Sequence, residues 1–430
     1  MRINETMFFE IVKLLYNLSF LLILLTILLE VYKKKYSIIV SLVFWFSFFY
    51  FCYIAFPCFF IEDINLRWNF SDATLNNTRI IVAIYNIIFS FYLYKFSIID
   101  KLLKNEVCMT QRYDIVYQIS NILELLGCFI ILIAILKLMN ARNNATGFRA
   151  YFIIREAGKD LEAKYHLRLL LYLLLSSSFY LYSKRRKIIF FIPLILIILF
   201  ETLAGERTTA FIVLLYIYIL YAVLKRTLAL KVIIPLVFLL LVGVLFSRAS
   251  ALNVKLDLNI IFGEFFETFT TLPYLIEHSL FGFGFNFERI LSDYTYVSFI
   301  PGTIKENLVT YLSVGGEMAE IIGRGYGLGS NFIFEQLFEF GAIGFLTSLT
   351  IPLLLIIFDR KLKGWNNLLI KILFFFQLRL YVREGISQFM IIFYIFIMYF
   401  AFFYFMHKKS HIIPIIKKQN KLIKLLKFDE

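Results

Sequence analysis

The chain has 430 residues, of which 60% are hydrophobic and 19% aromatic, while charged residues supply only 17%. Soluble domains are about 45–50% apolar, and a water-soluble protein of this length could not bury so much apolar surface. The net charge of +14 indicates membrane topology and affinity for anionic lipid rather than nucleic-acid binding. Composition therefore excludes a soluble enzyme and favours a membrane protein.

Apolar runs long enough to cross a bilayer, about 17–25 residues, recur along nearly the whole chain. We predict about eleven spans, within a range of ten to twelve: Ile11–Val31, Tyr36–Ile61, Arg79–Ile98, Ile115–Lys137, Leu167–Tyr182, Ile188–Ala204, Thr209–Leu224, Leu230–Ser247, Asn331–Phe358, Trp365–Tyr381 and Ile386–Met406. The first run lacks a small-residue cleavage site, so we expect no cleavable signal. The predicted fold is an all-α polytopic helix bundle, a single membrane domain over residues 1–430.

Basic residues fall on alternate connections between these spans, and short basic loops stay in the cytoplasm. The clusters are Lys33–Lys35, Lys101–Arg112, Ser183–Lys187, Lys225–Lys231, Arg360–Lys363 and the basic tail 407–430. Most arginines lie on the opposite, external side, where Arg2, Arg67, Arg79, Arg142 and Arg168 are typical helix-end anchors. The pattern predicts an external N-terminus and a cytoplasmic tail.

The longest connection, residues 248–329, lies on the external side and is rich in aromatic and aliphatic residues. We expect amphipathic helices within it, the first at Leu258–Leu272, lying in the plane of the membrane. Most of the glycines of the chain gather in or just after this loop, including the run Gly323–Gly329. A long ordered loop with concentrated glycine is usually functional.

Charged residues beside the spans at this external side need an explanation, because they are costly in a bilayer. The hairpin Gly205–Thr209 holds Arg207, which is either part of a neutralised polar turn or a clamp for an anion. Arg248, where a span meets the loop, is either an anchor or a ligand for phosphate. A guanidinium fork matches phosphate oxygens better than an ammonium does.

Two further segments place like charges one helical turn apart. Ser330 or Asn331 can cap a helix that carries Glu335 and Glu339 on one face, and we expect that helix to reach Phe358. These acids are candidates for catalysis, although acidic residues in a first turn also compensate the helix dipole. Arg379 and Arg383 share the same spacing, and two such charges repel unless an anion lies between them.

Several kinds of chemistry are missing from the sequence. We find no Walker loop, dinucleotide fingerprint, histidine cluster for a metal or Ser-His-Asp arrangement, and the four cysteines form no CxxC pair. We therefore expect neither a cofactor nor a metal. The external histidines are His166 and His278, of which His278 is a candidate general base.

The arrangement resembles the Wzy-type polymerases of O-antigen and capsular repeat units, which are related to O-antigen ligases and to GT-C glycosyltransferases. Three features support the resemblance: the hairpin at Arg207, the large external loop, and the exit of that loop. The exit reads Gly327-Leu328-Gly329-Ser330, then Glu335, then Phe340-Gly341-Ala342-Ile343-Gly344, similar to the Gly-Ser, Glu, Phe-Gly-x-x-Gly passage of the family.

The resemblance implies an enzyme of the bacterial inner membrane whose site faces the periplasm. It would join oligosaccharide repeat units carried on undecaprenyl pyrophosphate, with a chain-length regulator protein as a partner and no nucleic acid. Such a site must neutralise a pyrophosphate leaving group and take a proton from a hydroxyl. The candidate pyrophosphate ligands are Arg207, Arg248, Arg324, Arg379 and Arg383, and the candidate bases are Glu335, Glu339 and His278.

Two alternatives stay open. Another GT-C glycosyltransferase would use a polyprenyl-phosphate sugar and an acidic pair in its first external loop, for which Glu62-Asp63 is the candidate. A flippase or transporter of lipid-linked oligosaccharide would have two similar halves and charges at mid-membrane. No internal repeat is visible in the sequence, so we rank the transporter third.

Overall fold

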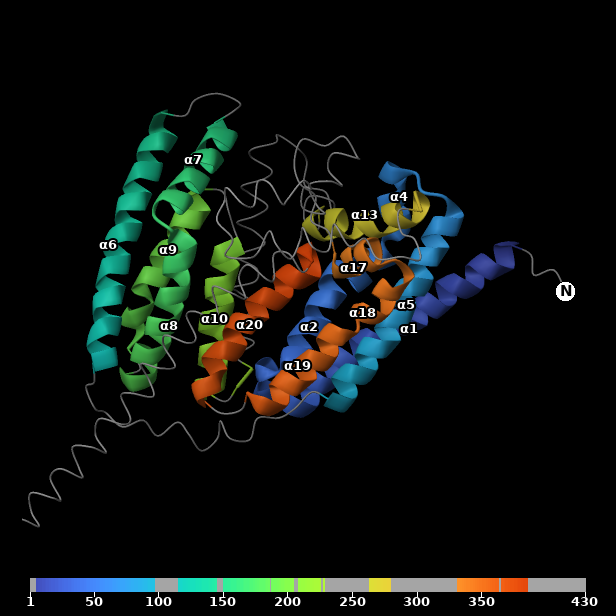
Figure 1. The fold of residues 1–430 in the computed structure, drawn as a ribbon, viewed down its shortest axis with the longest axis horizontal. Coiled ribbons are helices and arrows are strands. Elements are labelled where there is room, and N and C mark those ends of the chain that lie inside the picture. The colour runs from blue at the N-terminus through green and yellow to red at the C-terminus, as the bar shows by residue number, and fades with distance from the viewer. Residues whose placement is uncertain are drawn as a thin grey trace, which may run out of the picture. The chain divides into compact units, whose positions relative to one another are not determined.

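The computed structural model describes residues 5–96, 115–144, 150–185, 187–204, 208–225, 227–228, 263–279, 331–362 and 365–385. Within these ranges every regular element is helical (Figure 1), which confirms the predicted all-α class. Contacts divide the chain into two compact units. The prediction of one membrane domain over the whole chain stays a prediction.

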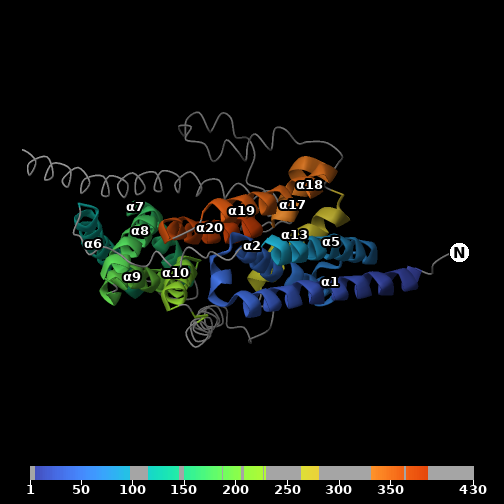
Figure 2. The ribbon, with the colours of Figure 1, turned by 90° about the horizontal axis from the view of Figure 1, so that it is seen from below.

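The first unit contains α1 (Glu5–Lys34), α2 (Leu42–Tyr50), α3 (Phe56–Phe59), α4 (Ile61–Trp68), α5 (Asp72–Phe96), α13 (Gly263–Glu277), α17 (Phe332–Phe340), α18 (Gly344–Thr347), α19 (Thr350–Lys361) and α20 (Trp365–Glu384). Its helix α1 lies along α5, as Figure 2 shows. One face of α1 buries Tyr16, Ile23 and Ile27, while the leucines of the opposite face are exposed. The exposed apolar face suits lipid, as expected for the predicted span Ile11–Val31.

The predicted span Tyr36–Ile61 is a chain of short helices. A 3₁₀ turn, η1 (Lys35–Val40), leads into α2, and a π-helical turn, η2 (Phe51–Ala55), joins α2 to α3. The segment Leu42–Phe59 is still long and apolar enough to cross a membrane. π-helical turns are rare in proteins, and those that occur are often found at functional sites. The turn η2 is therefore a candidate part of a functional site.

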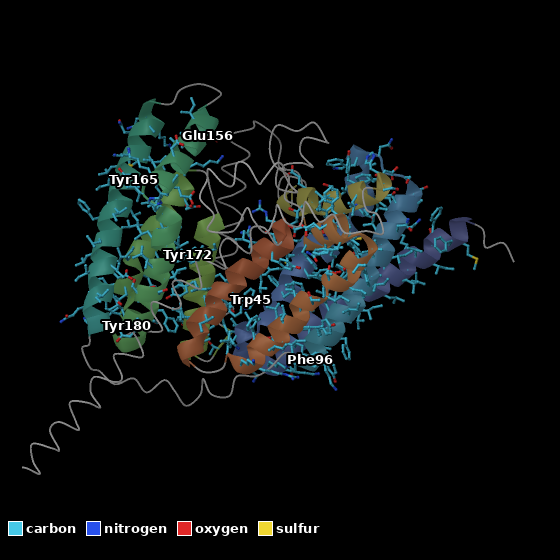
Figure 3. All side chains as sticks on the ribbon, viewed as in Figure 1. Trp45, Phe96, Glu156, Tyr165, Tyr172 and Tyr180 are labelled. Atoms are coloured by element: carbon cyan, nitrogen blue, oxygen red, sulfur yellow. The ribbon has the colours of Figure 1, made fainter. Side chains whose placement is uncertain are left out.

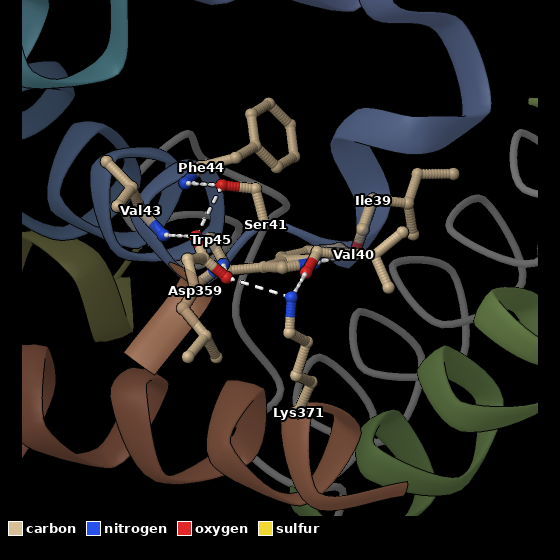
Figure 4. A network of polar contacts seen from close by, with 9 residues as sticks. Ile39, Val40, Ser41, Val43, Phe44, Trp45, Asp359 and Lys371 are labelled. Carbon is tan, nitrogen blue, oxygen red and sulfur yellow. Dashed lines mark hydrogen bonds and ion pairs between the residues drawn. The ribbon is translucent and has the colours of Figure 1, made fainter. Parts of the chain in front are cut away.

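A buried ion pair fastens the start of α2 to α19 and α20 (Figure 4). The carboxylate of Asp359 accepts hydrogen bonds from Ser41 Oγ at 2.8 Å, from Leu42 N at 3.0 Å and from Val43 N at 3.2 Å. Lys371 Nζ lies 3.2 Å from Asp359 Oδ1 and donates to Val40 O at 3.3 Å. Asp359 therefore caps a helix and pairs a charge at the same time.

We expect Asp359→Asn to destabilise the protein by about 3–5 kcal/mol, because it leaves the buried Lys371 ammonium without its carboxylate. Thermal unfolding of the purified protein in detergent measures the change. The control is Glu156→Gln, which removes an exposed pair with Lys159 (3.0 Å) and should cost about 0–1 kcal/mol. Equal effects of the two substitutions would contradict the role given to Asp359.

The prediction of one continuous helix from Asn331 to Phe358 was wrong, although the two helical stretches found there could together form one bent span. Helix α17 ends at Phe340, a 3₁₀ turn η5 (Gly341–Ile343) follows, and the two helical stretches on either side of Ser348 and Leu349 meet at 53°. Gly341 takes a left-handed φ of 59°, which favours glycine. At Gly344 an added Cβ would lie 2.0 Å from the carbonyl oxygen of Gln336, so this glycine packs closely on the backbone of α17.

The second unit contains α6 (Ile115–Asn144), α7 (Ala150–Lys164), α8 (Leu167–Arg185), η4 (Ile188–Phe191), α9 (Ile192–Ala204) and most of α10 (Thr208–Lys225). Helix α6 packs against α7, α8 and α9. Figure 3 labels Tyr165, which lies just before α8, and Tyr172 and Tyr180, which lie in α8. The sequence analysis predicts a connection between spans at residues 140–166. In the structure, helix α7 occupies much of this segment.

The predicted number of about eleven spans is not confirmed. Four described helices are long and apolar enough to cross a membrane, or five if the bent pair around Leu349 counts as one. The apolar parts of α8, α9 and α10 are shorter. The predicted spans Leu230–Ser247 and Ile386–Met406, and the tail 407–430, lie outside the described residues.

Individual cation–π and ion pairs show which charged segments of the first unit lie near each other. At the C-terminal end of α5, Lys33 lies over the ring of Tyr94 and Arg360 over that of Phe96, at 5.3 and 5.8 Å from the ring centroids. At the other end, Glu62 of α4 pairs with Arg79 of α5. Two of the predicted cytoplasmic clusters therefore share one end, as the alternation of basic loops requires.

We expect a cysteine at Lys361 to be protected from an impermeant thiol reagent in intact spheroplasts, and a cysteine at Ser279 to react. Both positions are exposed in the structure, and they lie in segments that the basic-residue pattern assigns to opposite faces. The native cysteines are replaced first, and permeabilised cells show that both positions can react. The reverse labelling pattern would invert the predicted orientation.

Candidate active site

The exit of the loop 248–329 begins with a capped helix. Asn331 accepts a hydrogen bond from Phe334 N at 2.9 Å through Oδ1, and its Nδ2 donates to Thr268 O at 3.2 Å and to Thr271 Oγ1 at 3.3 Å. The predicted cap at Asn331 is confirmed. The same side chain joins α17 to α13, which corresponds in part to the amphipathic helix predicted at Leu258–Leu272.

Glu335 and Glu339 are both fully buried on α17. The sequence prediction placed them near the outer membrane interface, on the assumption that their helix continued to Phe358. In the structure this helix, α17, is nine residues or about two and a half turns long, and its residues Phe332, Phe334 and Leu337 are buried as well. Buried carboxyl groups are costly, and they are found where they have a structural or chemical task.

The carboxyl group of Glu335 rests on the backbone of Gly385. Gly385 follows α20 with a left-handed φ of 80°, and its N–H donates to Tyr381 O at 2.9 Å, which closes the helix. An ideal Cβ at this position would lie 1.9 Å from Glu335 Oε2, so only glycine leaves room for the carboxyl group. The structure thus brings the loop exit and the end of α20 together.

Two of the five arginines predicted as pyrophosphate ligands lie on this part of α20. Arg379 is buried, and its Nε donates to the hydroxyl group of Tyr53 at 3.0 Å. Its guanidinium carbon lies 5.9 Å from the centre of the Tyr53 ring, within range of a cation–π interaction. Arg383 is half-buried one turn later, two residues before Gly385.

Tyr53 is a site residue that sequence reasoning missed. It belongs to the π-helical turn η2 and precedes Arg379 by 326 residues. Its ring also lies 4.7 Å from that of Phe265 on α13. Nothing in the local sequence singles it out among the aromatic residues of this segment; the irregular turn is visible only in the structure.

His278, the third candidate base, lies in the turn that directly follows α13. It is exposed and its ring centre is 4.2 Å from that of Tyr274. The neighbouring Glu277 accepts hydrogen bonds from Ser71 N at 3.1 Å and Ser71 Oγ at 2.7 Å, and hydrogen bonds from Thr74 and Ser71 lower its pKa. His278 is about 10 Å along the helix from Thr271, so it belongs to the junction with α5 rather than to the contact at Asn331.

Glu62, the candidate of the rival glycosyltransferase reading, is engaged in ion pairs. Its Oε1 lies 2.9 Å from Lys13 Nζ and 2.7 Å from Arg79 Nη2. Hydrogen bonds from Lys13 and then from Arg79 lower the pKa of Glu62. The partners favour its ionised form, which makes Glu62 a weak base, and they give Arg79 a pairing role in addition to its predicted one as an anchor.

The remaining predicted site residues, Arg207, Arg248 and Arg324, lie outside the described residues. Arg207 directly precedes the start of α10, and the loop 248–329 is described only between 263 and 279. Within the described ranges no group of three or more His, Cys, Asp or Glu residues is placed to hold a metal.

No protein-family model matches the chain, and neither does a curated protein or a solved structure. The resemblance to Wzy-type polymerases therefore depends on the residues quoted for it.

Proposed function

We propose that this protein polymerises oligosaccharide repeat units that are carried on undecaprenyl pyrophosphate, at the external face of a bacterial inner membrane. The product is an O-antigen or capsular polysaccharide. The donor is a growing glycan on its lipid, and the acceptor is a single lipid-linked repeat unit. A chain-length regulator is the expected protein partner.

One observation supports this proposal most strongly: the fully buried carboxyl group of Glu335 rests on Gly385, immediately after the turn that carries Arg383. Two segments that the sequence singles out separately therefore meet, although about fifty residues lie between them. The combination that this transfer needs is a carboxylate and arginines in one region, and the contact of Glu335 with Gly385 brings α17 to the end of α20 that carries Arg379 and Arg383.

The proposed reaction follows from these groups. A hydroxyl oxygen of the acceptor attacks the anomeric carbon of the first donor sugar, and the bond from that carbon to the pyrophosphate oxygen breaks. The hydroxyl proton passes to Glu335, or to Glu339 in its place, acting as a general base. Arg383 pairs with the negative charge on the departing undecaprenyl pyrophosphate through a bidentate fork.

Arg379 has a supporting part in this scheme. Its Nε is engaged by Tyr53 at 3.0 Å, and its charge adds to the positive potential at the end of α20. Arg207, Arg248 and Arg324 remain candidates for the same pyrophosphate or for that of the acceptor.

The alternatives receive less support. A polyprenyl-phosphate-dependent glycosyltransferase needs a base in the first external loop, and Glu62 is held there by Lys13 and Arg79. A transporter is expected to place its charges at mid-membrane between similar halves. The buried acids and arginines at the junction of α17 and α20 favour chemistry at that junction.

Deletion of the gene tests the proposed function. The surface glycan should then carry at most one repeat unit, because export and ligation proceed without a polymerase. Gel electrophoresis of lipopolysaccharide or capsule shows the ladder. A full ladder in the deletion strain would refute the proposal, and loss of even the single unit would favour a flippase.

We expect Arg383→Lys to lose most polymer in a complemented deletion strain while membrane abundance stays normal. Lysine keeps the charge but replaces a planar fork by a point charge, so a bidentate clamp fails. Arg79→Lys is the matched control, because an anchor and ion-pair partner of Glu62 tolerates lysine. A wild-type ladder from Arg383→Lys would remove Arg383 from the site.

A further inference from the structure

The second unit contains an acidic residue inside an apolar helix. Glu124 lies on α6, within the segment Tyr117–Asn143 that is long and apolar enough to span a membrane. Its neighbours Leu125 and Leu126 are exposed, whereas Glu124 itself is only 7% exposed and faces inward. An ionisable group at such a position is a candidate functional site by its cost alone.

Glu124 differs from the buried acids of the first unit. Glu30 lies 2.6 Å from Lys34 Nζ, and Asp359 lies 3.2 Å from Lys371 Nζ. Among the side chains that the structure describes, no basic group forms an ion pair with Glu124. Its Oε1 lies 2.5 Å from Ser177 Oγ on α8, and its Oε2 is buried and forms no hydrogen bond to any described residue.

With an ionised Glu124, the Ser177 hydroxyl would be the donor both to Glu124 Oε1 and to Leu174 O, and it has one hydrogen for the two. Ser177 Oγ lies 3.2 Å from Leu174 O. If that hydrogen goes to Leu174 O, the hydrogen between Ser177 and Glu124 comes from the carboxyl group. A neutral acid also leaves Oε2 as a carbonyl oxygen, which costs far less to bury than a charged one.

We propose that Glu124 is a proton-binding site: a carboxylic acid inside the second unit that donates its proton to Ser177 and exchanges it with the surroundings. The ligand is a proton, and the site is separate from the proposed active site in the first unit. The proposal is independent of the polymerase function.

The groups around Glu124 are uncharged in their ordinary forms at neutral pH. Tyr216 of α10 and Cys128, one turn along α6, interact with it electrostatically. The Tyr216 hydroxyl donates to Leu175 O at 2.8 Å and lies 3.0 Å from Ser178 Oγ.

The charged groups of the other helices packed on α6 lie farther along it. The end of α7 is near Lys137, whose Nζ is 5.4 Å from the centre of the Tyr165 ring, about 20 Å along the axis from Glu124. Glu201, which is the titratable residue of α9, lies close to Ala204, and Ala204 contacts Gly158 of α7. None of these described side chains places a charge beside the Glu124 carboxyl group.

Dicyclohexylcarbodiimide, a lipid-soluble reagent for protonated carboxyl groups, tests the proposal. The acid proton moves to a carbodiimide nitrogen, the carboxyl oxygen bonds to the central carbon, and an oxygen-to-nitrogen acyl shift leaves a stable acylurea. Membranes containing the full chain are treated between pH 5 and 10, and the modified residue is mapped by mass spectrometry. Modification of Glu124 should fall about tenfold per pH unit above its midpoint.

Glu30 and Asp359 serve as internal controls, because each forms an ion pair with a lysine and should therefore be labelled less than Glu124. Ser177→Ala should move the labelling midpoint of Glu124 to lower pH, since the protonated form loses its acceptor. A midpoint that moves to higher pH would instead show that Ser177 donates to a carboxylate. That result would overturn the proposal. So would a Glu124 that is unlabelled at every pH, or one that sodium chloride, but not choline chloride, protects from labelling.

Discussion

Glu335→Gln should lower the rate of polymerisation by about 10²–10⁴, because glutamine keeps the size and hydrogen bonding of the side chain but cannot accept a proton. Glu335 is fully buried against Gly385. Glutamine has nearly the same size and shape as glutamate, so the substitution should not prevent folding. The measurement is the length distribution of surface glycan in the complemented deletion strain, with membrane abundance checked by immunoblotting.

Glu62→Gln is the matched control for this prediction. Glu62 is the acid of the rival reading, and it is exposed and paired with Lys13 and Arg79. Its loss should leave the ladder unchanged. If Glu335 merely compensated the dipole of α17, its substitution would cost only about 0.3–1 kcal/mol of stability and no polymer. A normal ladder from Glu335→Gln together with a lost ladder from Glu62→Gln would show that the catalytic base is Glu62 and not Glu335.

Gly385→Ala should abolish most activity although it adds only one methyl group. Its Cβ would lie 1.9 Å from Oε2 and 2.1 Å from Cδ of Glu335, so the carboxyl group must leave its place. The φ of 80° is also unfavourable for alanine. Because the end of α20 then shifts with respect to α17, we expect the loss in the polymer ladder to exceed any loss in abundance.

Gly127→Ala is the control for Gly385→Ala. It adds the same methyl group at a glycine that does not contact Glu335. There the new methyl group would meet the ends of the Leu174 side chain, the nearest at 2.7 Å, and a flexible side chain can rotate away. Gly127 lies in α6, outside the proposed active site, so polymer length should stay normal. Equal losses from Gly385→Ala and Gly127→Ala would mean that the contact with Glu335 has no special part.

Local patterns predicted much of the fold. Apolar length located α1, α5, α6 and α20, because a span must be covered by apolar side chains whatever its neighbours are. The cap at Asn331 followed from a polar residue before a helical run. The same length criterion missed α7, since Ala150–Lys164 is a charged helix with no continuous apolar run.

Features that depend on distant contacts could not be predicted. The break after Phe340 arises from a left-handed Gly341 and from the close packing of Gly344 on Gln336. Glycines are also common inside continuous membrane helices, so their presence did not distinguish the two outcomes. The sequence shows that Glu335 and Glu339 are four residues apart, as are Arg379 and Arg383. It does not show that the helix with the two acids meets the end of the helix with the two arginines. That meeting depends on the contact of Glu335 with Gly385.

The proposed chemistry is tested most directly with the purified protein in proteoliposomes, supplied with the lipid-linked repeat unit of its host. We expect longer glycans to form and undecaprenyl pyrophosphate to appear in equal amount to the new linkages, with wild-type protein but not with Glu335→Gln. Formation without added nucleotide or metal would agree with a site made of arginines and carboxylates. Unchanged repeat units in the presence of well-folded wild-type protein, or their transfer across the membrane without elongation, would contradict the proposal.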